Sequence, residues 1–376
     1  MEQMDLFSLL DENDEMREKF ATKKSTDWKW TMANDYPKDK NGLKVFSCFA
    51  CGGGSTMGYK LAGCDVIGCC EIDPKMNEVY VKNHNPKHNY LMDIREFNKI
   101  PNEELPKELF NLDILDGSPP CTTFSMAGDR EESWGKKKKF REGQAEQTLD
   151  DLSFVFIETA AKLRPKVVIV ENVEGLIKGE AWSYVQRIYK HFKDIGYTVK
   201  HWLLKGENMG VPQTRHRAFF IAVRNDNNFD LETLDMSFNY NPVLFRDAKE
   251  GIGYNIKGRL HHLLSLALPC EKDMGEVTTR VEGKRSCFNQ KIIHDNDVMC
   301  TIPAGHNCIW RFTEKTKISK QDIINCSTFP RDYDFVQNTF ANVNYICGMS
   351  VPPIMIKRIV TRLIESGVFR KKGEME

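Results

Sequence analysis

Short apolar runs, each about as long as one β-strand, recur along this chain and alternate with segments of helical periodicity. The run KVVIVENV at 166–173 is almost wholly apolar, which is typical of a strand buried on both faces of a sheet. The alternation predicts an α/β fold, with a doubly wound, mostly parallel, Rossmann-like sheet and a second, smaller domain. Strands are expected at 43–49, 65–71, 110–115 and 166–173, with a further strand pair at 197–205 and 217–223.

Apolar residues spaced three and four apart predict the helices between these strands. One helix follows the first strand and runs to about Gly63, and a last helix begins at about Pro352. We expect the last helix to pack back on the sheet, which makes the sheet domain discontinuous in sequence. The helix predicted at 149–163 carries its apolar stripe on Leu149, Leu152, Phe156, Ala160 and Leu163.

The same pattern divides the chain into four segments. Residues 1–42 are polar and are expected to form an N-terminal arm that docks through Trp28 and Trp30. The strand–helix alternation then fades after residue 245, and residues 246–320 hold 13 Lys and Arg against 9 Asp and Glu. We therefore predict a sheet domain at 43–245, a second domain at 246–335 and a C-terminal segment at 336–376 that returns to the first domain.

The composition of the chain restricts the kinds of binding partner and the cellular compartment to be expected. The chain has 376 residues, of which 41% are hydrophobic and 28% charged, an ordinary globular balance. Lys plus Arg and Asp plus Glu both number 53, so attraction to a nucleic acid must come from a local patch. No apolar run approaches about 18 residues, and the first ten residues include Glu2 and Asp5, so neither a membrane span nor a signal peptide is expected. Several of the 12 cysteines fall in predicted core strands, which suits a reducing cytoplasm.

Glycines mark the turn after the first strand, in ACGGGSTMG (50–58). Such a turn lets the backbone approach a ligand closely. A phosphate-binding P-loop is disfavoured because Tyr59 stands where Lys is needed, and the dinucleotide pattern fails because Met57 replaces its third glycine. Cys48 and Cys51 form a CxxC pair, but no second pair follows at zinc spacing, so we expect no metal.

Two acidic residues stand near the ends of other expected strands. Glu71 ends the second strand about twenty residues after the glycine turn, where proteins of this fold hold a ribose diol. The alternative is a solvated carboxylate that caps the helix beginning at Pro74. Asp93, in the sequence MDI, follows another expected strand.

The stretch DGSPPCTTFS (116–125) directly follows the strand at 110–115. Its Pro-Pro pair holds the backbone extended, so Cys121 is expected on a loop just beyond a strand end, where catalytic groups gather. An isolated cysteine in such a place is more often a small buried residue than a nucleophile. A basic run, Lys136 to Lys139, follows; it is either a solvated face or a loop that closes on a phosphate backbone, and we favour the loop.

Three further polar residues lie at later strand ends. The apolar run at 166–173 presents Glu171, and VPQTRHR (211–217) presents Arg215 and Arg217. Their spacing of two predicts that the two arginines share one strand face. The carboxyl ends of parallel strands meet at one edge of a sheet, so these side chains are expected near Cys121.

Six motifs in their usual order resemble the cytosine-C5 DNA methyltransferases, and the resemblance covers nearly all of residues 43–368. The glycine turn resembles the family's F-A-G-x-G-G motif, and Pro-Pro-Cys, ENV and QTRHR follow it. The last two motifs are ISKQDIINCSTFPRDYDF (318–335) and NYICGMSVPPIMIKRIVTRLIESGV (344–368). The chain departs from the family at five positions: Ser47 stands where Asp is common, Cys51 for Gly, Thr122 for Gln, Asp322 for Glu and Met349 for Asn.

The resemblance implies methyl transfer from S-adenosylmethionine to C5 of a cytosine flipped out of double-stranded DNA. It makes Cys121 the nucleophile that adds to C6 and Glu171 the partner of N3, with Arg215 and Arg217 on the base O2 and the adjacent phosphate. It places Glu71 on the ribose and Asp93 on the adenine amino group, and residues 246–335 at the position of the target-recognition region. The implied cofactor-binding residues are Phe49, Gly53, Gly54, Glu71, Ile72, Asp93, Pro120 and Ser350.

Two alternatives stay open at this point. The first is methylation of cytosine in tRNA, although the tripeptide Cys-Phe-Thr, typical of that branch, is absent here. The second is a catalytically silent DNA-binding relative. The departure at Met349 favours it, and the joint presence of Cys121, Glu171, Arg215 and Arg217 disfavours it. We expect a monomeric bacterial or phage enzyme of DNA modification or restriction–modification that works in the cytoplasm.

Overall fold

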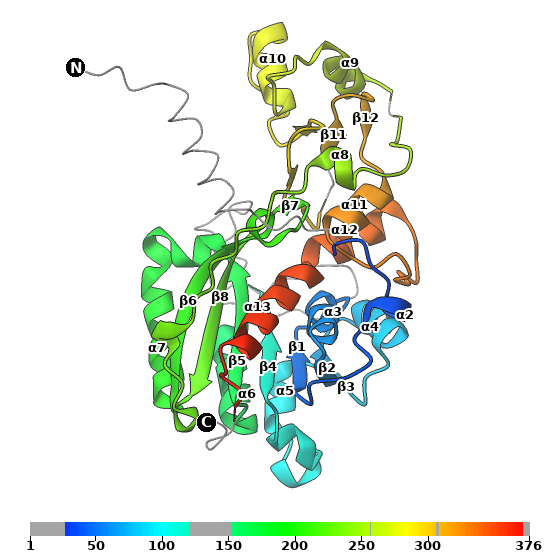
Figure 1. Cartoon of the computed structure of the whole chain (residues 1–376). Coiled ribbons are helices and arrows are strands. Elements are labelled where there is room, and N and C mark those ends of the chain that lie inside the picture. Colours follow the sequence, from blue (N-terminus) through cyan, green and yellow to red (C-terminus); the bar gives the residue numbers. More distant parts are fainter. Residues whose placement is uncertain (1–26, 121–151, 256, 306–307, 371–376) are drawn as a thin grey trace, which may run out of the picture.

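Seven strands form the central sheet of the computed structural model, which describes residues 27–120, 152–255, 257–305 and 308–370. Their order is β3-β2-β1-β4-β5-β8-β6 (Figure 1). Neighbours from β3 to β5 are parallel, whereas β8 is antiparallel to both β5 and β6. The expected doubly wound, mostly parallel sheet is therefore confirmed. The strands are β1 (Lys44–Cys48), β2 (Asp65–Glu71), β3 (His88–Leu91), β4 (Ile114–Gly117), β5 (Val167–Val173), β6 (Tyr197–Lys205) and β8 (His216–Arg224).

The direction of β8 follows from the length of the connection before it. Residues 206–215 join β6 to β8, and they hold only a short 3₁₀ turn, η5 (Gly206–Met209), and β7 (Gln213–Thr214). A parallel crossover needs about a dozen residues or more and usually a helix. The two strands are therefore antiparallel neighbours, paired from Tyr197–Arg224 to Lys205–His216.

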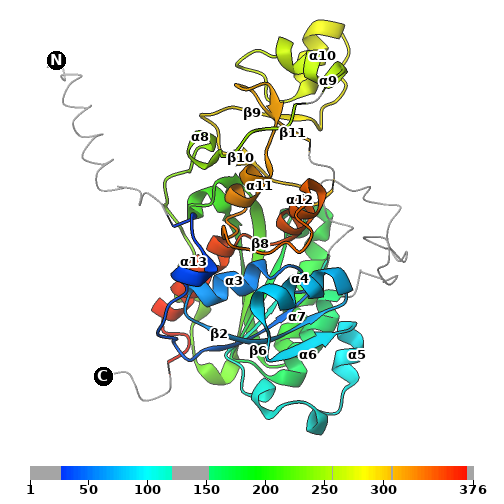
Figure 2. The same ribbon diagram turned by 90° about the vertical axis from the view of Figure 1, so that its right-hand side faces the viewer.

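Helices cover both faces of the sheet (Figures 1 and 2). One core cluster joins Val45, Ile114 and Ile169 to α3 (Gly54–Leu61), α4 (Pro74–His84) and α13 (Pro353–Glu365). A second cluster joins the residues that alternate with these, such as Phe46 and Leu115, to α5 (Ile94–Lys99), α6 (Leu152–Leu163) and α7 (Trp182–Asp194). Strands buried on both faces need apolar residues at every position, which explains the unbroken runs in the sequence.

The last helix, α13, packs on α3, the helix that follows the first strand. Gly58 of α3 faces α13 so closely that a Cβ added there would lie 2.5 Å from Ile356 Cβ and from Pro353 O. Helix α13 therefore joins the core beside the glycine turn, although it lies some three hundred residues later in the chain. The helix predicted at 149–163 is observed as α6; residues 149–151 lie outside the described part of the chain.

A smaller lobe lies beyond the end of the sheet where the site residues gather (Figure 1, top). Its separate core contains Leu264, Val277, Ile292 and Trp310. The division of the chain at residues 245 and 335 stays a prediction. The lobe is built from α9 (Arg259–Leu266), α10 (Met274–Glu282) and a three-stranded sheet of β9 (Lys291–Ile293), β11 (Ile309–Arg311) and β12 (Thr316–Lys317), and β10 (Met299–Cys300) pairs with β7.

The N-terminal segment contributes two buried tryptophans. Trp28 and Trp30 are buried as expected, and Trp30 Nε1 donates to Thr328 O over 2.8 Å.

Of the helices that the structure describes, none is both long and apolar enough to cross a membrane. The other elements are α2 (Met32–Asp35), α8 (Phe245–Ala248), α11 (Lys320–Cys326), α12 (Phe340–Met349), η1 (Asn102–Glu104), η2 (Lys107–Phe110), η3 (Glu174–Ile177), η4 (Gly179–Ala181), η6 (Asn225–Asn227) and η7 (Leu231–Thr233).

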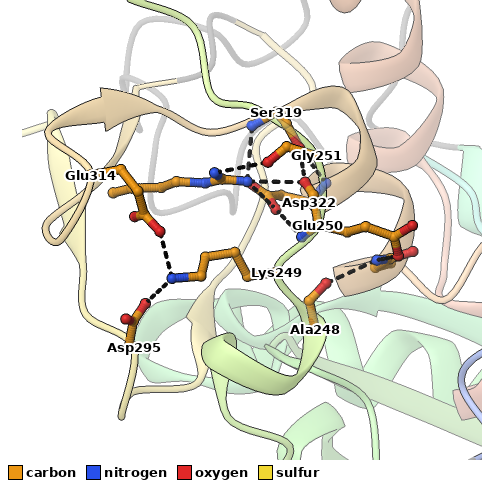
Figure 3. Close-up of polar contacts among 10 residues, drawn as sticks. Ala248, Lys249, Glu250, Gly251, Asp295, Glu314, Ser319 and Asp322 are labelled. Carbon is orange, nitrogen blue, oxygen red and sulfur yellow. Dashed lines mark hydrogen bonds and ion pairs between the residues drawn. The ribbon is translucent and has the colours of Figure 1, made fainter.

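A buried ion pair ties the smaller lobe to the segments beneath it (Figure 3). Arg311 of β11 donates to both carboxylate oxygens of Asp322 in α11, over 2.9 and 2.8 Å. The same guanidinium also donates to Glu250 O and Gly251 O. Asp322 in turn accepts from the backbone N–H groups of Glu250 and Ser319, so three segments converge on one carboxylate. The side chains of Arg311 and Asp322 are only 4% and 0% exposed.

Removing one partner of this pair leaves a buried charge without compensation. We expect Asp322→Asn to lower the free energy of unfolding by about 3–5 kcal/mol. Chemical denaturation at neutral pH measures the change.

The matched control is Glu250→Gln, which breaks the exposed pair between Arg331 and Glu250, whose side chains are 48% and 42% exposed. Exposed ion pairs contribute about 0–1 kcal/mol to stability. The free energy of unfolding of this variant is therefore expected to stay near that of the parent protein. Equal losses in the two variants would contradict the assigned role of Asp322.

Candidate active site

Alternate residues of the glycine turn between β1 and α3 have a left-handed backbone conformation. Phe49, Cys51 and Gly53 have φ values of 55°, 46° and 82°. A Cβ added at Gly53 would lie 2.1 Å from Nε2 of His84, and one at Gly54 would lie 2.4 Å from Val351 O. Burial lowers the pKa of His84 to about 3, so a neutral imidazole packs against the turn. Glycine is therefore required at 53 by contacts and by conformation, and at 54 by contacts alone.

Glu71 holds this turn from the end of β2. Its Oε2 accepts from Cys51 N over 2.7 Å and its Oε1 from Asp73 N over 2.8 Å. Burial raises the pKa of the Glu71 carboxyl group. The helix-capping role considered for Glu71 falls to Asp73, which accepts from Lys75 N at the start of α4. Each Glu71 oxygen keeps a lone pair for a further donor such as a hydroxyl group.

The other predicted cofactor residues surround the same turn or follow neighbouring strands. Ile72 follows β2 directly and is half-buried, as are Phe49 beside Phe156 and Pro120 after β4. Asp93 caps α5 by accepting from Arg95 N over 2.8 Å.

Ser350 lies against the turn on the other side. Its buried Oγ has no hydrogen-bond partner among the described residues, and a Cβ at Gly54 would lie 3.3 Å from it. A free buried hydroxyl, a glycine turn and a carboxylate at the end of β2 fit a cofactor with a polar amino-acid end and a ribose.

Glu171 and Arg217 meet at the carboxyl end of β5. Arg217 Nε lies 2.9 Å from Glu171 Oε1, and both side chains are mostly buried. In the β5–β8 register Arg217 is opposite Val173, so it reaches Glu171 on the diagonal. The pair joins adjacent strands at the edge where the glycine turn also lies.

Arg215 lies in the connection between β7 and β8, so the prediction that both arginines share one strand is wrong. The strand begins at His216 because the chain turns sharply there: Arg215 N donates back to Gln213 O, and Gly206 N donates to Arg215 O. The Arg215 side chain is buried and donates to Gly348 O over 3.0 Å. Burial, followed by the charge of Arg217, lowers its pKa to about 9.

Asn172 fixes the segment that leads to the predicted nucleophile. Its Nδ2 donates to Pro119 O over 3.2 Å, which ties the Pro-Pro pair to the end of β5. Cys121 itself, Thr122 and the basic run Lys136 to Lys139 lie outside the described residues. Pro120 is the last described residue before Cys121.

Sequence reasoning missed one buried acid, Asp116, at the end of β4. Its Oδ2 accepts from Ser47 Oγ over 2.8 Å and its Oδ1 from the Tyr59 hydroxyl over 3.0 Å. Burial raises the pKa of Asp116 to about 7, and the charge of Glu171 acts in the same direction. The signal was present in the sequence, since Asp116 is a charged residue at the end of an apolar strand, three residues before Pro119.

Two further expectations concern Met349 and a metal site. Met349 ends α12 next to Ser350 and is 40% exposed. Within residues 27–120, 152–255, 257–305 and 308–370, no group of three or more His, Cys, Asp or Glu side chains is arranged to hold a metal ion.

Comparison with known proteins agrees with this geometry. The chain is 27% identical over 329 residues to the Type II methyltransferase M.HindV of Haemophilus influenzae, covering 86% of this chain and 96% of the relative. It is 33% identical over 186 residues to M.FnuDI of Fusobacterium nucleatum, also a Type II methyltransferase, covering 50% of this chain and 48% of the relative.

Solved structures share the fold. A prophage-encoded Escherichia coli protein with a proposed role as a DNA modification methyltransferase superposes with a TM-score of 0.63 at 19% identity, covering 86% of this chain and 99% of that one. A variant of Spodoptera frugiperda DNMT2 gives 0.58 at 15% identity, covering 86% and 100%.

The sheet and its solved neighbours show a Rossmann-like fold of the kind that methyltransferases have. A profile of C-5 cytosine-specific DNA methylases matches residues 43–365, so the chain belongs to that family and is an enzyme that methylates C5 of cytosine in DNA.

The contact between Gly53 and His84 is open to a direct test. Gly53 and Gly63 have φ values of 82° and 83°, but the nearest atom to a Cβ at Gly63 is 3.5 Å away. Alanine in a left-handed conformation costs about 1–2 kcal/mol, which both variants share. We expect Gly53→Ala to lose a further 1–3 kcal/mol, roughly, through overpacking against His84. Chemical denaturation of both variants measures the difference in their free energies of unfolding. Equal losses would show that Gly53 and His84 are not tightly packed.

Proposed function

We propose that this enzyme transfers the methyl group of S-adenosylmethionine to C5 of a cytosine flipped out of a specific double-stranded DNA sequence. The observation that carries the proposal is the pairing of Glu171 with Arg217 at the end of β5, where Asn172 also holds the Pro-Pro segment that leads to Cys121. A nucleophile, an acid and a base-holding arginine are thereby assigned to one sheet edge, which is where ligands of such sheets bind.

Each of these residues has a role in one step of the methyl transfer. Cytosine C5 is too weak a nucleophile to accept a methyl group directly, and addition of the Cys121 thiolate to C6 makes C5 electron-rich. Glu171, in its protonated form, donates to N3 and neutralises the charge that develops in the ring. Arg217 orients Glu171 and, with Arg215, holds the base and the adjacent phosphate. Loss of the C5 proton and elimination of Cys121 complete the reaction.

The glycine turn supplies the cofactor site in this proposal. Gly53 and Gly54 allow close approach of the backbone, Glu71 accepts from the ribose hydroxyls, and the free Ser350 hydroxyl faces the turn. Phe49, Ile72, Asp93 and Pro120 complete the site in the sense implied by the family resemblance. The bound cofactor supplies an activated methyl group on its sulfonium.

The setting of the enzyme is inferred from its relatives. M.HindV and M.FnuDI are Type II methyltransferases, and another relative is an orphan methyltransferase of Bacillus phage SPR. We therefore propose a bacterial or phage DNA-modifying enzyme, of the restriction–modification kind, that acts as a monomer in the cytoplasm. In the proposed domain division, residues 246–335 read the DNA sequence and the segments 43–245 and 336–376 carry out catalysis.

The covalent step predicts a trapped complex. With 5-fluorocytosine at the target position, fluorine cannot leave as a proton, so the Cys121–C6 adduct is expected to persist. Protein and DNA should then remain linked through denaturing electrophoresis, and only when S-adenosylmethionine is supplied.

Two variants separate the parts of this mechanism. Cys121→Ser should bind DNA and cofactor but form no adduct, because a hydroxyl group is a poor nucleophile without a strong base. Glu171→Gln should form the adduct slowly. A trapped peptide that contains a cysteine other than Cys121 would overturn the assignment.

The domain proposal predicts transferable specificity. Replacing residues 246–320 by the corresponding region of a relative should change the DNA sequence that is methylated and leave cofactor affinity within about twofold, since the glycine turn lies outside this region. Bisulfite sequencing of a plasmid and equilibrium binding of the cofactor measure the two outcomes. An unchanged target sequence would refute the assignment of this region to DNA recognition.

A further inference from the structure

The order of the strands marks a point where the chain changes direction across the sheet. From β1 it continues to β2 and β3 on one side, and it then crosses to β4 and β5 on the other side (Figure 1). Sheets of this kind bind ligands at such a switch point, beyond the carboxyl ends of the strands that flank it. Ser47 and Asp116 are register partners there, each one residue before the end of its strand. Asp116 therefore lies at the place where a ligand is expected.

Asp116 is a buried acid without a positively charged partner. The residue is 2% exposed, and it accepts hydrogen bonds from two neutral groups, Ser47 Oγ and the Tyr59 hydroxyl. No Lys, Arg or His among the described residues forms an ion pair with it. Burial raises the pKa of Asp116 to about 7, and the negative charge of Glu171 acts in the same direction. A carboxylate in such surroundings is unfavourable until a cation compensates its charge.

The neighbouring acids differ from Asp116 in this respect. Glu171 at the end of β5 pairs with Arg217 over 2.9 Å. Glu71 at the end of β2 accepts from the backbone N–H groups of Cys51 and Asp73. Among these three acids, Asp116 alone has only hydroxyl partners in the described part of the chain. A cation bound at this edge would therefore stabilise Asp116 more than the other two.

The proposed cofactor carries such a cation. The sulfonium of S-adenosylmethionine is bonded both to the methylene group of the ribose and to the methyl group that is transferred. In the proposed function, Glu71 of β2 receives the ribose, and Cys121, beyond β4, receives the cytosine. Strand β1 lies between β2 and β4, so the sulfonium is expected over the ends of β1 and β4, where Asp116 lies.

We propose that Asp116 is the counter-charge of the cofactor's sulfonium and makes the site prefer the charged methyl donor to its neutral product, S-adenosylhomocysteine. The inference rests on the proposed function. Opposite charges attract across several ångströms in a buried region, so the effect needs no direct contact. Methyl transfer removes the positive charge, and the product is then held less tightly than the donor was.

Ser47 shows that this carboxyl group has moved between strands. The cytosine-C5 DNA methyltransferases commonly have Asp at position 47, and in this chain Ser47 Oγ lies one hydrogen bond, 2.8 Å, from Asp116 Oδ2. The switch point thus keeps one carboxyl group, which β4 carries in place of β1.

Replacing Asp116 by Asn tests the proposal, because it removes the charge and keeps the shape. S-adenosylmethionine and S-adenosylhomocysteine differ by one methyl group and one positive charge. At pH 8, where Asp116 is mostly ionised, equilibrium binding should show an affinity for S-adenosylmethionine about tenfold lower in Asp116→Asn, and an affinity for S-adenosylhomocysteine within about twofold of the parent. An equal loss for both ligands would show that Asp116 only shapes the site, and would overturn the inference.

Asp113→Asn is the matched control. Asp113 precedes the same strand at its opposite end, where it accepts from Lys44 N and pairs with Lys166 Nζ over 2.7 Å. Its loss should leave the ratio of the two affinities unchanged, because the switch point is at the other end of β4.

An exchange of the two register partners separates charge from position. The double variant Ser47→Asp with Asp116→Ser returns the carboxyl group to β1, and we expect it to recover most of the lost preference for S-adenosylmethionine. A double variant that binds S-adenosylmethionine no better than Asp116→Asn does would contradict the inference.

A further variant covers failure of Asp116→Asn to fold. Ser47→Ala keeps the carboxyl group but removes a donor that favours its ionised form, so the affinity ratio should move in the same direction by a smaller amount. A ratio that stays in place in Asp116→Asn, or in Ser47→Ala if the first variant is unfolded, overturns the inference. The parent protein tests the proposed function separately, since failure to bind S-adenosylmethionine or to transfer its labelled methyl group to DNA would refute the reaction itself.

Discussion

The close packing of the turn after β1 is the constraint on which the rest of the structure depends. The turn touches His84 from α4, Tyr333, whose hydroxyl donates to Gly52 O, and the segment that begins at Ser350. These contacts are possible only because residues 52 to 54 lack side chains. The turn therefore organises the start of the sheet and the last two helices together, and Glu71 closes it from the second strand.

The carboxyl edge of the sheet carries an uneven distribution of charge. Arg215, Glu171 and Asp116 are buried there, and the side chain of Arg217 is 15% exposed. Low dielectric strengthens each of these interactions and raises the cost of any unpaired charge.

The smaller lobe is attached by a buried ion pair and a short strand pairing. Its own core is small, and its attachment to the sheet domain runs through the buried pair of Arg311 and Asp322 and through the short pairing of β7 with β10. Asp322 also completes the capping box of α11 with Ser319. One carboxylate thus begins a helix and holds a strand of the lobe, which explains why an acid is needed at a position where the family has the longer Glu.

The sequence by itself determined the class of fold, the strands and the family, because runs buried on both faces must be apolar and the motifs that end them stand in a fixed order. It also located Glu171 and Arg217 at strand ends, and the structure joins them in an ion pair. Only the tertiary structure decided the antiparallel β8, the place of Arg215 outside the strand and the contact of His84 with Gly53. In the sequence, Ser47 stood out only as a residue that replaces the Asp common in the family. Its register with Asp116 shows that the acid lies on the neighbouring strand, and a register between strands some seventy residues apart depends on packing that no local pattern encodes.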